Sequence, residues 1–228
     1  RDQPRSRGLG DVYKRQAQFC NIGAQIAVWS FIIRYAMHNL GFNEVITSLG
    51  ANADADTITD ALRNLEPVAG GFYAICDAVG LDALLPRTAE QAGATYYIMS
   101  LVLFVIMRFV CTWLMKYIDH RKILSVLAVV AVMCCLGTVF STGFFGVYCL
   151  MGISSCMSMM FPTIYGMGIE GLGDDTKLGG SGMVMAIAGA SVLTQIMGIL
   201  SDKFGNIAVA YIVPAVAFAV IAYYAMVV

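Results

Sequence analysis

Four polar side chains lie at helical spacing in the first long apolar stretch of the chain. Gln18, Asn21, Gln25 and Trp29 are separated by three, four and four residues. At about 100° per residue they fall within roughly 80° of one another, so they would form one stripe along a helix. Amides bind hydroxyls, and an indole offers an apolar face. Such a set can hold a sugar, although an ordinary packed tryptophan explains Trp29 equally well.

Three further apolar stretches carry polar stripes of their own. A polar group costs free energy in hydrocarbon unless it faces a partner or water, so four stripes predict a shared wet cavity. From these stripes we add Tyr97, Ser158, Tyr165 and Gln195 to the candidate binding residues. Helix packing is the alternative, and we favour it for the serines and threonines. The stripes are Tyr97, Ser100 and Arg108 beside Phe104, then Ser154, Ser158 and Tyr165 beside Pro162, and finally Ser191, Thr194 and Gln195.

Positively charged residues in or beside the apolar stretches form a second candidate group. Arg34 is about 160° from the Gln18 stripe, so it pairs with a neighbouring helix or extends outward. Arg108 lies on the polar face of its own stretch, near its end. A gating role is the default for an ion within a membrane, and a structural role is the alternative.

The composition indicates that a membrane surrounds these residues. Of 228 residues, 59% are hydrophobic and only 13% are charged, and the mean hydropathy is +0.74. An average soluble domain is about half apolar and roughly a quarter charged, so a soluble enzyme is nearly excluded. The net charge of −1 offers no footprint for nucleic acid. Six stretches have the roughly 20 residues that a helical span needs: 17–40, 94–116, 123–142, 144–168, 179–201 and 207–228.

Two regions fall outside these spans. Residues 1–16 are basic, and the stretch GLGDVYKRQ resembles a translated adaptor scar, so we treat them as a non-native head on a truncated chain. Residues 41–93 form an acidic insert, for which an extramembrane cap is favoured over a binding module. Its spacing predicts one short helix through Ile58, Leu62 and Leu65 and another through Phe72, Ile75 and Val79. Lysines and arginines near the span ends favour an extracytoplasmic insert.

Several kinds of chemistry lack support in the sequence. No Asp or Glu lies in the interior of a predicted span, and a proton-coupled carrier normally needs an acid or His there. Six of the seven cysteines lie in apolar runs, and neither histidine lies near a cysteine pair, so we expect no metal site. No nucleophile has a nearby base, and no nucleotide-binding glycine pattern follows a strand. We therefore expect neither an enzyme nor a cofactor.

Four segments resemble helices seven, eight, ten and eleven of the fucose permease family, sugar–proton symporters of the major facilitator superfamily. They are AQFCNIGAQIAVWSFIIRYA (17–36), RFVCTWLMKYI (108–118), MSMMFPTIYGMGIEGLGDDTKLGGS (157–181) and GILSDKFGNI (198–207). The resemblance covers 17–228 except the insert. It implies an all-α membrane protein whose six transmembrane helices are the C-terminal half of a twelve-helix carrier, with the coupling acids in the other half.

Two functions remain open from the sequence. The resemblance implies half of a multi-pass transporter in a bacterial inner membrane, carrying a monosaccharide of the fucose, glucose or galactose class with protons by alternating access. By position, the resemblance implies that Gln18, Asn21, Gln25 and Trp29 face the sugar pathway. It also implies a cytoplasmic gate region that contains Arg108, Lys116, Arg121 and Lys122. The alternative is a membrane sugar sensor on the same scaffold, with the insert as an exterior domain. The polar stripes disfavour a purely structural bundle.

Overall fold

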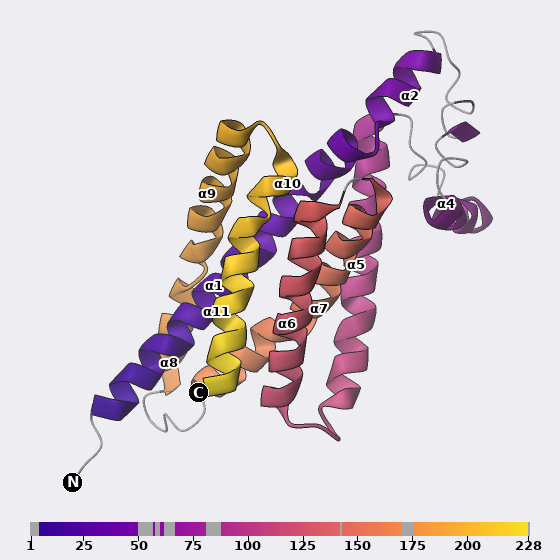
Figure 1. Cartoon of the computed structure of the whole chain (residues 1–228). Helices are drawn as coiled ribbons and strands as arrows, with labels where there is room; N and C mark the ends of the chain where they lie inside the picture. Colours follow the sequence, from indigo (N-terminus) through magenta and orange to yellow (C-terminus); the bar gives the residue numbers. More distant parts are fainter. Residues whose placement is uncertain are drawn as a thin grey trace.

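The computed structural model describes residues 5–49, 57, 60–61, 67–80, 88–141, 143–169 and 176–227, and among these it contains helices and no strands. This all-helical architecture confirms the predicted fold class. Figure 1 shows the helices as a bundle with both chain ends at the same end. In chain order they are α1 (Arg5–Asn39), α2 (Phe42–Leu49), α4 (Pro67–Val79), α5 (Ala89–Leu114), α6 (His120–Phe140), α7 (Phe144–Ile169), α8 (Thr176–Met185), α9 (Ala188–Phe204), α10 (Ile207–Ala210) and α11 (Ile212–Val227).

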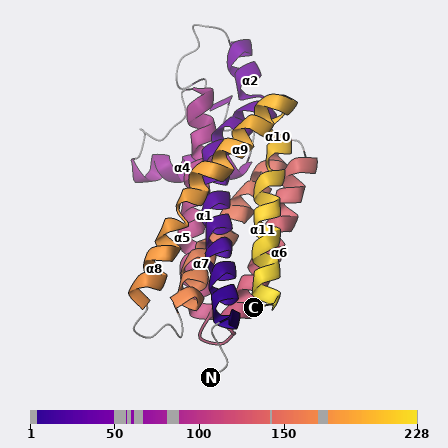
Figure 2. The same ribbon diagram turned by 90° about the vertical axis from the view of Figure 1, so that its left-hand side faces the viewer.

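The helix α1 occupies the centre of the bundle, where it packs against α5, α7, α9 and α11. The helix α6 packs against α7 and α11 and completes the far side (Figures 1 and 2). Small residues let α1 and α9 approach each other closely. A Cβ added at Gly23 would lie 2.7 Å from the carbonyl oxygen of Gly189, so only glycine fits there without a shift. This arrangement gives α1 polar neighbours on several sides at once.

Four of the described helical stretches are long and apolar enough to cross a membrane: Glu90–Leu114, His120–Phe140, Phe144–Gly168 and Ile207–Met226. The predicted span 17–40 is part of α1, whose lower hydropathy follows from its amides. This helix begins at Arg5, so it continues into the residues that the sequence analysis set apart as a head. The predicted span 179–201 is divided between α8 and α9, neither of which is long enough alone.

The last predicted span, 207–228, is also interrupted, and a proline explains the interruption. Pro214 has no N–H to donate to the Ala210 carbonyl, and Ala210 is the last residue of α10. Upstream, Gly205 takes a left-handed conformation with φ of 61° that ends α9. Asn206 then accepts a hydrogen bond from the backbone N–H of Ala208 at 2.9 Å and starts α10.

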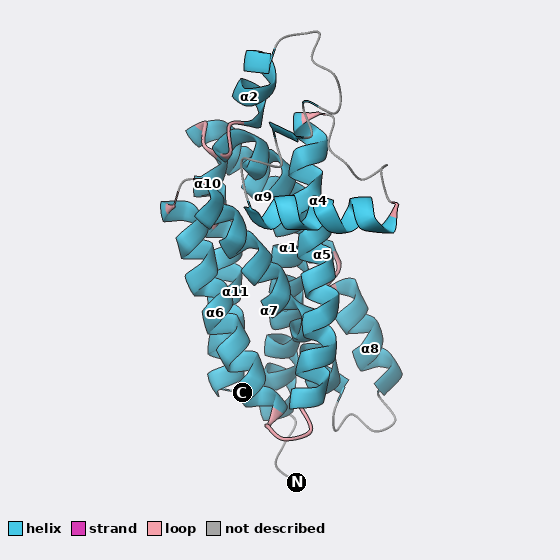
Figure 3. Cartoon of the chain, turned by 90° about the vertical axis from the view of Figure 1, so that its right-hand side faces the viewer, coloured by secondary structure: helices cyan, strands magenta, loops and turns pink. Residues whose placement is uncertain are grey.

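The insert contains helical structure where it is described. The predicted helix through Phe72, Ile75 and Val79 is present as α4, which lies across the upper part of α5 (Figure 3). The Tyr73 hydroxyl donates to the Thr95 hydroxyl oxygen at 3.2 Å and links the two helices. The other predicted helix falls on Ile58, Leu62 and Leu65, which lie outside the described residues.

Candidate functional site

Three helices meet at one hydroxyl group deep in the bundle. The indole N–H of Trp29 on α1 donates to the Ser154 hydroxyl oxygen on α7 at 3.3 Å. The Ser100 hydroxyl on α5 donates to the same oxygen at 2.5 Å. Ser154 in turn donates to the carbonyl of Leu150, one turn earlier in its own helix, at 3.2 Å. Ser154 therefore uses its donor and accepts twice, so it holds the neighbouring helices in register.

The same network orients the indole of Trp29. Phe104 of α5 lies edge-on to it, with ring centroids 5.3 Å apart and planes at 72°. The Ser154 hydroxyl binds the polar edge of the indole, and Phe104 supports the ring. Trp29 nevertheless stays half-buried. A half-buried aromatic ring held at its edge and side is a rigid apolar platform of the kind that packs against the C–H face of a sugar.

Two amides of the α1 stripe lie about two to three turns from Trp29. Gln18 and Asn21 are fully buried, and both polar atoms of each amide lack a hydrogen-bond partner among the described residues. The buried hydroxyl of Ser158 on α7 also lacks a hydrogen-bond partner among these residues. Burying an unpaired polar group costs roughly 1–3 kcal/mol. Native proteins keep such groups where water, an ion or a ligand supplies the partner.

The remaining predicted binding residues are dispersed. Gln25 is half-buried on α1, and Tyr97 is half-buried on α5. Tyr165 of α7 stacks on Phe161, with centroids 6.2 Å apart and planes at 8°. Gln195 is exposed on α9, which packs on the face of α1 that carries Gly23. The structure thus joins Trp29 to the α5 and α7 stripes through Ser100 and Ser154 and leaves Gln195 outside this network.

The predicted charged residues lie on α1, on α5 and at the turn between α5 and α6. Arg34 is exposed on α1, with its guanidinium carbon 5.9 Å from the centroid of the Phe31 ring. Arg108 of α5 donates from Nη1 to the Ser158 carbonyl at 3.2 Å. Lys116, Arg121 and Lys122 are exposed where α5 turns into α6.

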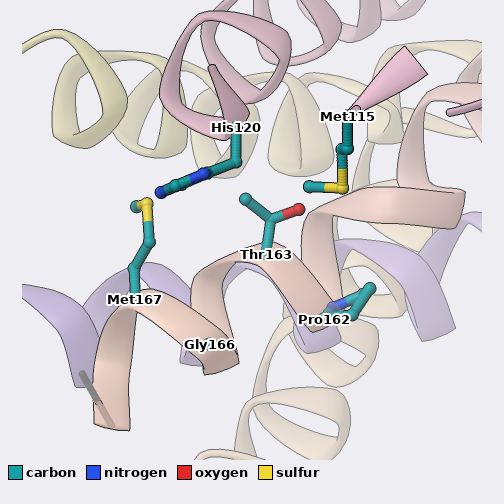
Figure 4. Close-up of a pocket in the computed structure, with 6 residues that line it drawn as sticks. All are labelled: Met115, His120, Pro162, Thr163, Gly166 and Met167. Atoms are coloured by element: carbon teal, nitrogen blue, oxygen red, sulfur yellow. The ribbon is translucent and has the colours of Figure 1, made fainter. Parts of the chain in front are cut away.

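Two cavities lie near this turn. One, of about 510 Å³, is lined by residues 115–120 and Lys122. The other, of about 300 Å³, lies between the turn and the second half of α7, where His120 and the sulfur atoms of two methionines surround it (Figure 4). No group of three or more His, Cys, Asp or Glu side chains in the described part of the chain is placed to hold a metal ion. The lining residues of the smaller cavity are Met115, His120, Pro162, Thr163, Gly166 and Met167.

Ser100, Ser154 and Phe104 hold the centre of the site, although the sequence analysis did not place them among the binding residues. They belonged to the stripes that it recognised, and helix packing was the favoured interpretation for the serines. Packing is indeed what Ser100 and Ser154 do, since their hydroxyls bond across three helices. The signal for their position was the shared spacing with Tyr97 and Ser158.

Known proteins resemble the chain over most of its length. It is 34% identical over 205 residues to an L-fucose-proton symporter of Escherichia coli K12, an alignment that includes 90% of this chain and 36% of that protein. It is 35% identical over 120 residues to a glucose/galactose transporter of Brucella abortus, including 53% of this chain and 29% of that protein. A crystal structure of the major facilitator superfamily transporter FucP in the outward conformation matches with a TM-score of 0.73 and 33% identity, over 98% of this chain and 43% of that one. No family model matches the chain.

Proposed function

We propose that this chain, which belongs to the fucose permease family of the major facilitator superfamily, works as one half of a sugar transporter. It spans little more than a third of the length of the curated symporter that it matches, and it corresponds to the C-terminal half of that fold. The transporter would carry a monosaccharide of the fucose, glucose or galactose class into the cell with protons. It would do so by alternating access in the inner membrane of a bacterium.

The observation that carries this proposal is the fixed indole of Trp29. It gains its meaning from the transporters that this chain resembles. Those relatives include an L-fucose-proton symporter and a glucose/galactose transporter. The Trp29 indole is held by Ser154 and Phe104 from two other helices, so its face has a defined direction. The buried amides of Gln18 and Asn21, which have no partner in the described part of the chain, would supply hydrogen bonds along the same stripe. The sensor alternative gains no support from these relatives, which are transporters by name.

Transport then follows from the movement of two halves about a site between them. In major facilitator proteins the halves rock against each other around a fixed midplane site. Here Trp29, Gln25, Tyr97, Ser158 and Tyr165 would line the sugar path from this half, and Gln195 would reach it only when the other half is in place. The charged turn between α5 and α6 would form part of the gate. We place the proton-binding carboxylate in the partner half, and we treat residues 1–16 as a foreign head and 41–93 as an exterior cap.

Uptake by the complete transporter tests this function. The extended reading frame is expressed, purified and placed in proteoliposomes, and uptake of labelled fucose, glucose and galactose is followed with an imposed proton gradient. At least one of the sugars should accumulate, and collapsing the gradient should abolish the accumulation. Uptake that ignores the gradient would contradict symport, and the absence of uptake for all three sugars would contradict the substrate class.

A pair of tryptophan variants tests the site. Trp29→Ala should lower sugar affinity at least tenfold, because the apolar platform is lost. Trp113→Ala is the matched control, since Trp113 is exposed near the end of α5 and packs on Tyr117 with centroids 5.2 Å apart. We expect the control to bind sugar normally. Equal losses in the two variants would remove Trp29 from the site.

A further inference from the structure

The helix α7 contains a proline in its interior, and this proline has a consequence at Ser158. In an α-helix each N–H bonds the carbonyl four residues earlier. Pro162 has no N–H, so the carbonyl of Ser158 has no partner of this kind within its helix. Ser158 itself is fully buried. A buried carbonyl without a partner costs free energy, so another donor is required.

Arg108 supplies that donor from the neighbouring helix. Its Nη1 donates a hydrogen bond to the Ser158 carbonyl oxygen at 3.2 Å. One turn further along α5, the Thr112 hydroxyl contacts the sulfur of Met159 at 3.7 Å, so the two helices are joined again beside the same carbonyl. A hydrogen bond from a charged donor is about twice as strong as a neutral one, which makes guanidinium a good substitute for the missing N–H.

We propose that Arg108 is a positioning residue of the sugar site, because it donates to the Ser158 carbonyl that Pro162 leaves free and so fixes the two halves of α7 relative to α5. The role in sugar binding rests on the function proposed above, and the pairing of Arg108 with Pro162 does not. Ser158 connects the two, since its carbonyl accepts from Arg108 and its helix carries Ser154 one turn away. Its buried hydroxyl has no partner among the described residues.

The turn of α7 that follows Pro162 has free space on one side. The cavity of about 300 Å³ lies beside Pro162 and the turn that follows it (Figure 4). Gly166 presents no side chain, and a Cβ added there would meet nothing within 4 Å. The segment after Pro162 therefore has space on this side. On its other side the segment packs into the core through the buried side chains of Ile164 and Met167, so the Arg108 bond adds to contacts already present.

A double-mutant cycle tests the pairing in the chain as it stands. Arg108→Met removes the donor and keeps the apolar stem, while Pro162→Ala restores the N–H that would satisfy Ser158 within α7. In detergent micelles, Arg108→Met alone should lower the folded-to-unfolded ratio about tenfold. In the Pro162→Ala background the same change should lower it less than about threefold. Arg34→Met is the matched control, and its effect should be the same in both backgrounds.

Sugar binding by the complete transporter separates positioning from direct contact. Arg108→Met should raise the Kd for sugar about tenfold, and adding Pro162→Ala should restore it, since the carbonyl no longer needs the guanidinium. Arg108→Lys keeps one donor and should show part of the loss. A loss that persists in the Pro162→Ala background would show that Arg108 contacts sugar, and it would overturn the proposal.

The remaining outcomes are also decisive. Equal effects of Arg108→Met on unfolding in the two backgrounds would refute the pairing, whatever the transporter binds. If Pro162→Ala does not fold, Pro162→Gly restores the same N–H and replaces it. If the wild-type transporter binds no sugar, the proposed function fails, while the unfolding cycle still decides the pairing of Arg108 with Pro162.

Discussion

Replacing Ser154 with alanine tests the hydroxyl that joins three helices. The substitution removes the acceptor of the Trp29 indole N–H at 3.3 Å and of the Ser100 hydroxyl at 2.5 Å. The side chain shrinks by only one oxygen atom, so the cavity left behind is small. What changes is the hydrogen bonding between α1, α5 and α7. We expect a loss of stability and a looser Trp29.

The size of the loss follows from the two bonds that cross between helices. Hydrogen bonds between membrane helices average about 0.6 kcal/mol and reach about 1.7 kcal/mol. Two such bonds therefore predict a decrease of about 1–3 kcal/mol in the free energy of unfolding. The bond from Ser154 to the Leu150 carbonyl contributes little, because that carbonyl belongs to the α-helical ladder of its own helix.

The neighbouring residue provides a matched control. Ser155 is also buried on α7, and its hydroxyl bonds the carbonyl of Met151 one turn earlier at 3.0 Å. Ser155→Ala therefore makes the same chemical change and removes a bond within one helix. We expect it to change stability by less than about 0.5 kcal/mol, since alanine has the higher helix propensity.

The assay is unfolding in mixed micelles, followed by circular dichroism. A Trp113→Phe background makes Trp29 the sole tryptophan, so its fluorescence anisotropy reports the mobility of the ring. Ser154→Ala should lower both stability and anisotropy, and Ser155→Ala should lower neither. Equal stability losses in the two variants, or an unchanged anisotropy in Ser154→Ala, would refute the role assigned to this hydroxyl.

Three further substitutions test helix packing and the buried amide of Asn21. Gly189→Ala should destabilise the chain by about 1–3 kcal/mol, because the added Cβ would collide with the Phe19 carbonyl. Gly166→Ala is the control and should be neutral or stabilising, since its Cβ would meet nothing within 4 Å. Thermal unfolding measures both variants, and an undiminished stability of Gly189→Ala would contradict the close α1–α9 contact. Asn21→Leu should raise stability by about 1 kcal/mol, because an apolar group of similar size replaces a buried amide that has no partner within the described ranges. The same change should weaken sugar binding. A decrease in stability would show that the amide has a partner in the folded chain.

Much of the fold could be predicted because hydrophobic length dominates a membrane protein. The stretches 94–116, 123–142 and 144–168 correspond closely to α5, α6 and α7. The division of 179–201 was not predicted, because no proline marks it. There the turn tightens, and the N–H of Ile187 bonds the carbonyl of Val184 only three residues earlier. Hydropathy does not record such a change in hydrogen bonding.

The site was predicted in part, and the reason lies in what helical spacing encodes. Spacing along one helix shows which residues share a face, so the stripes containing Trp29, Ser100 and Ser154 were recognisable. It does not show how far each helix is rotated toward its neighbours. The Gln195 stripe therefore seemed equivalent to the others, although the structure places Gln195 exposed on α9, outside the hydroxyl network.

The polar residues of the described spans differ in whether their hydrogen bonds are satisfied, and this difference separates the side chains that join helices from those that could bind a ligand. The hydroxyls of Ser100 and Ser154 are satisfied by each other and by the backbone, so they hold helices together and are unavailable to a ligand. The amides of Gln18 and Asn21 are buried without a partner among the described residues, so their burial costs free energy. A ligand or water that satisfies them would recover that free energy on binding. Trp29 belongs to both kinds, because its N–H serves the scaffold while its half-buried ring remains available to an apolar surface.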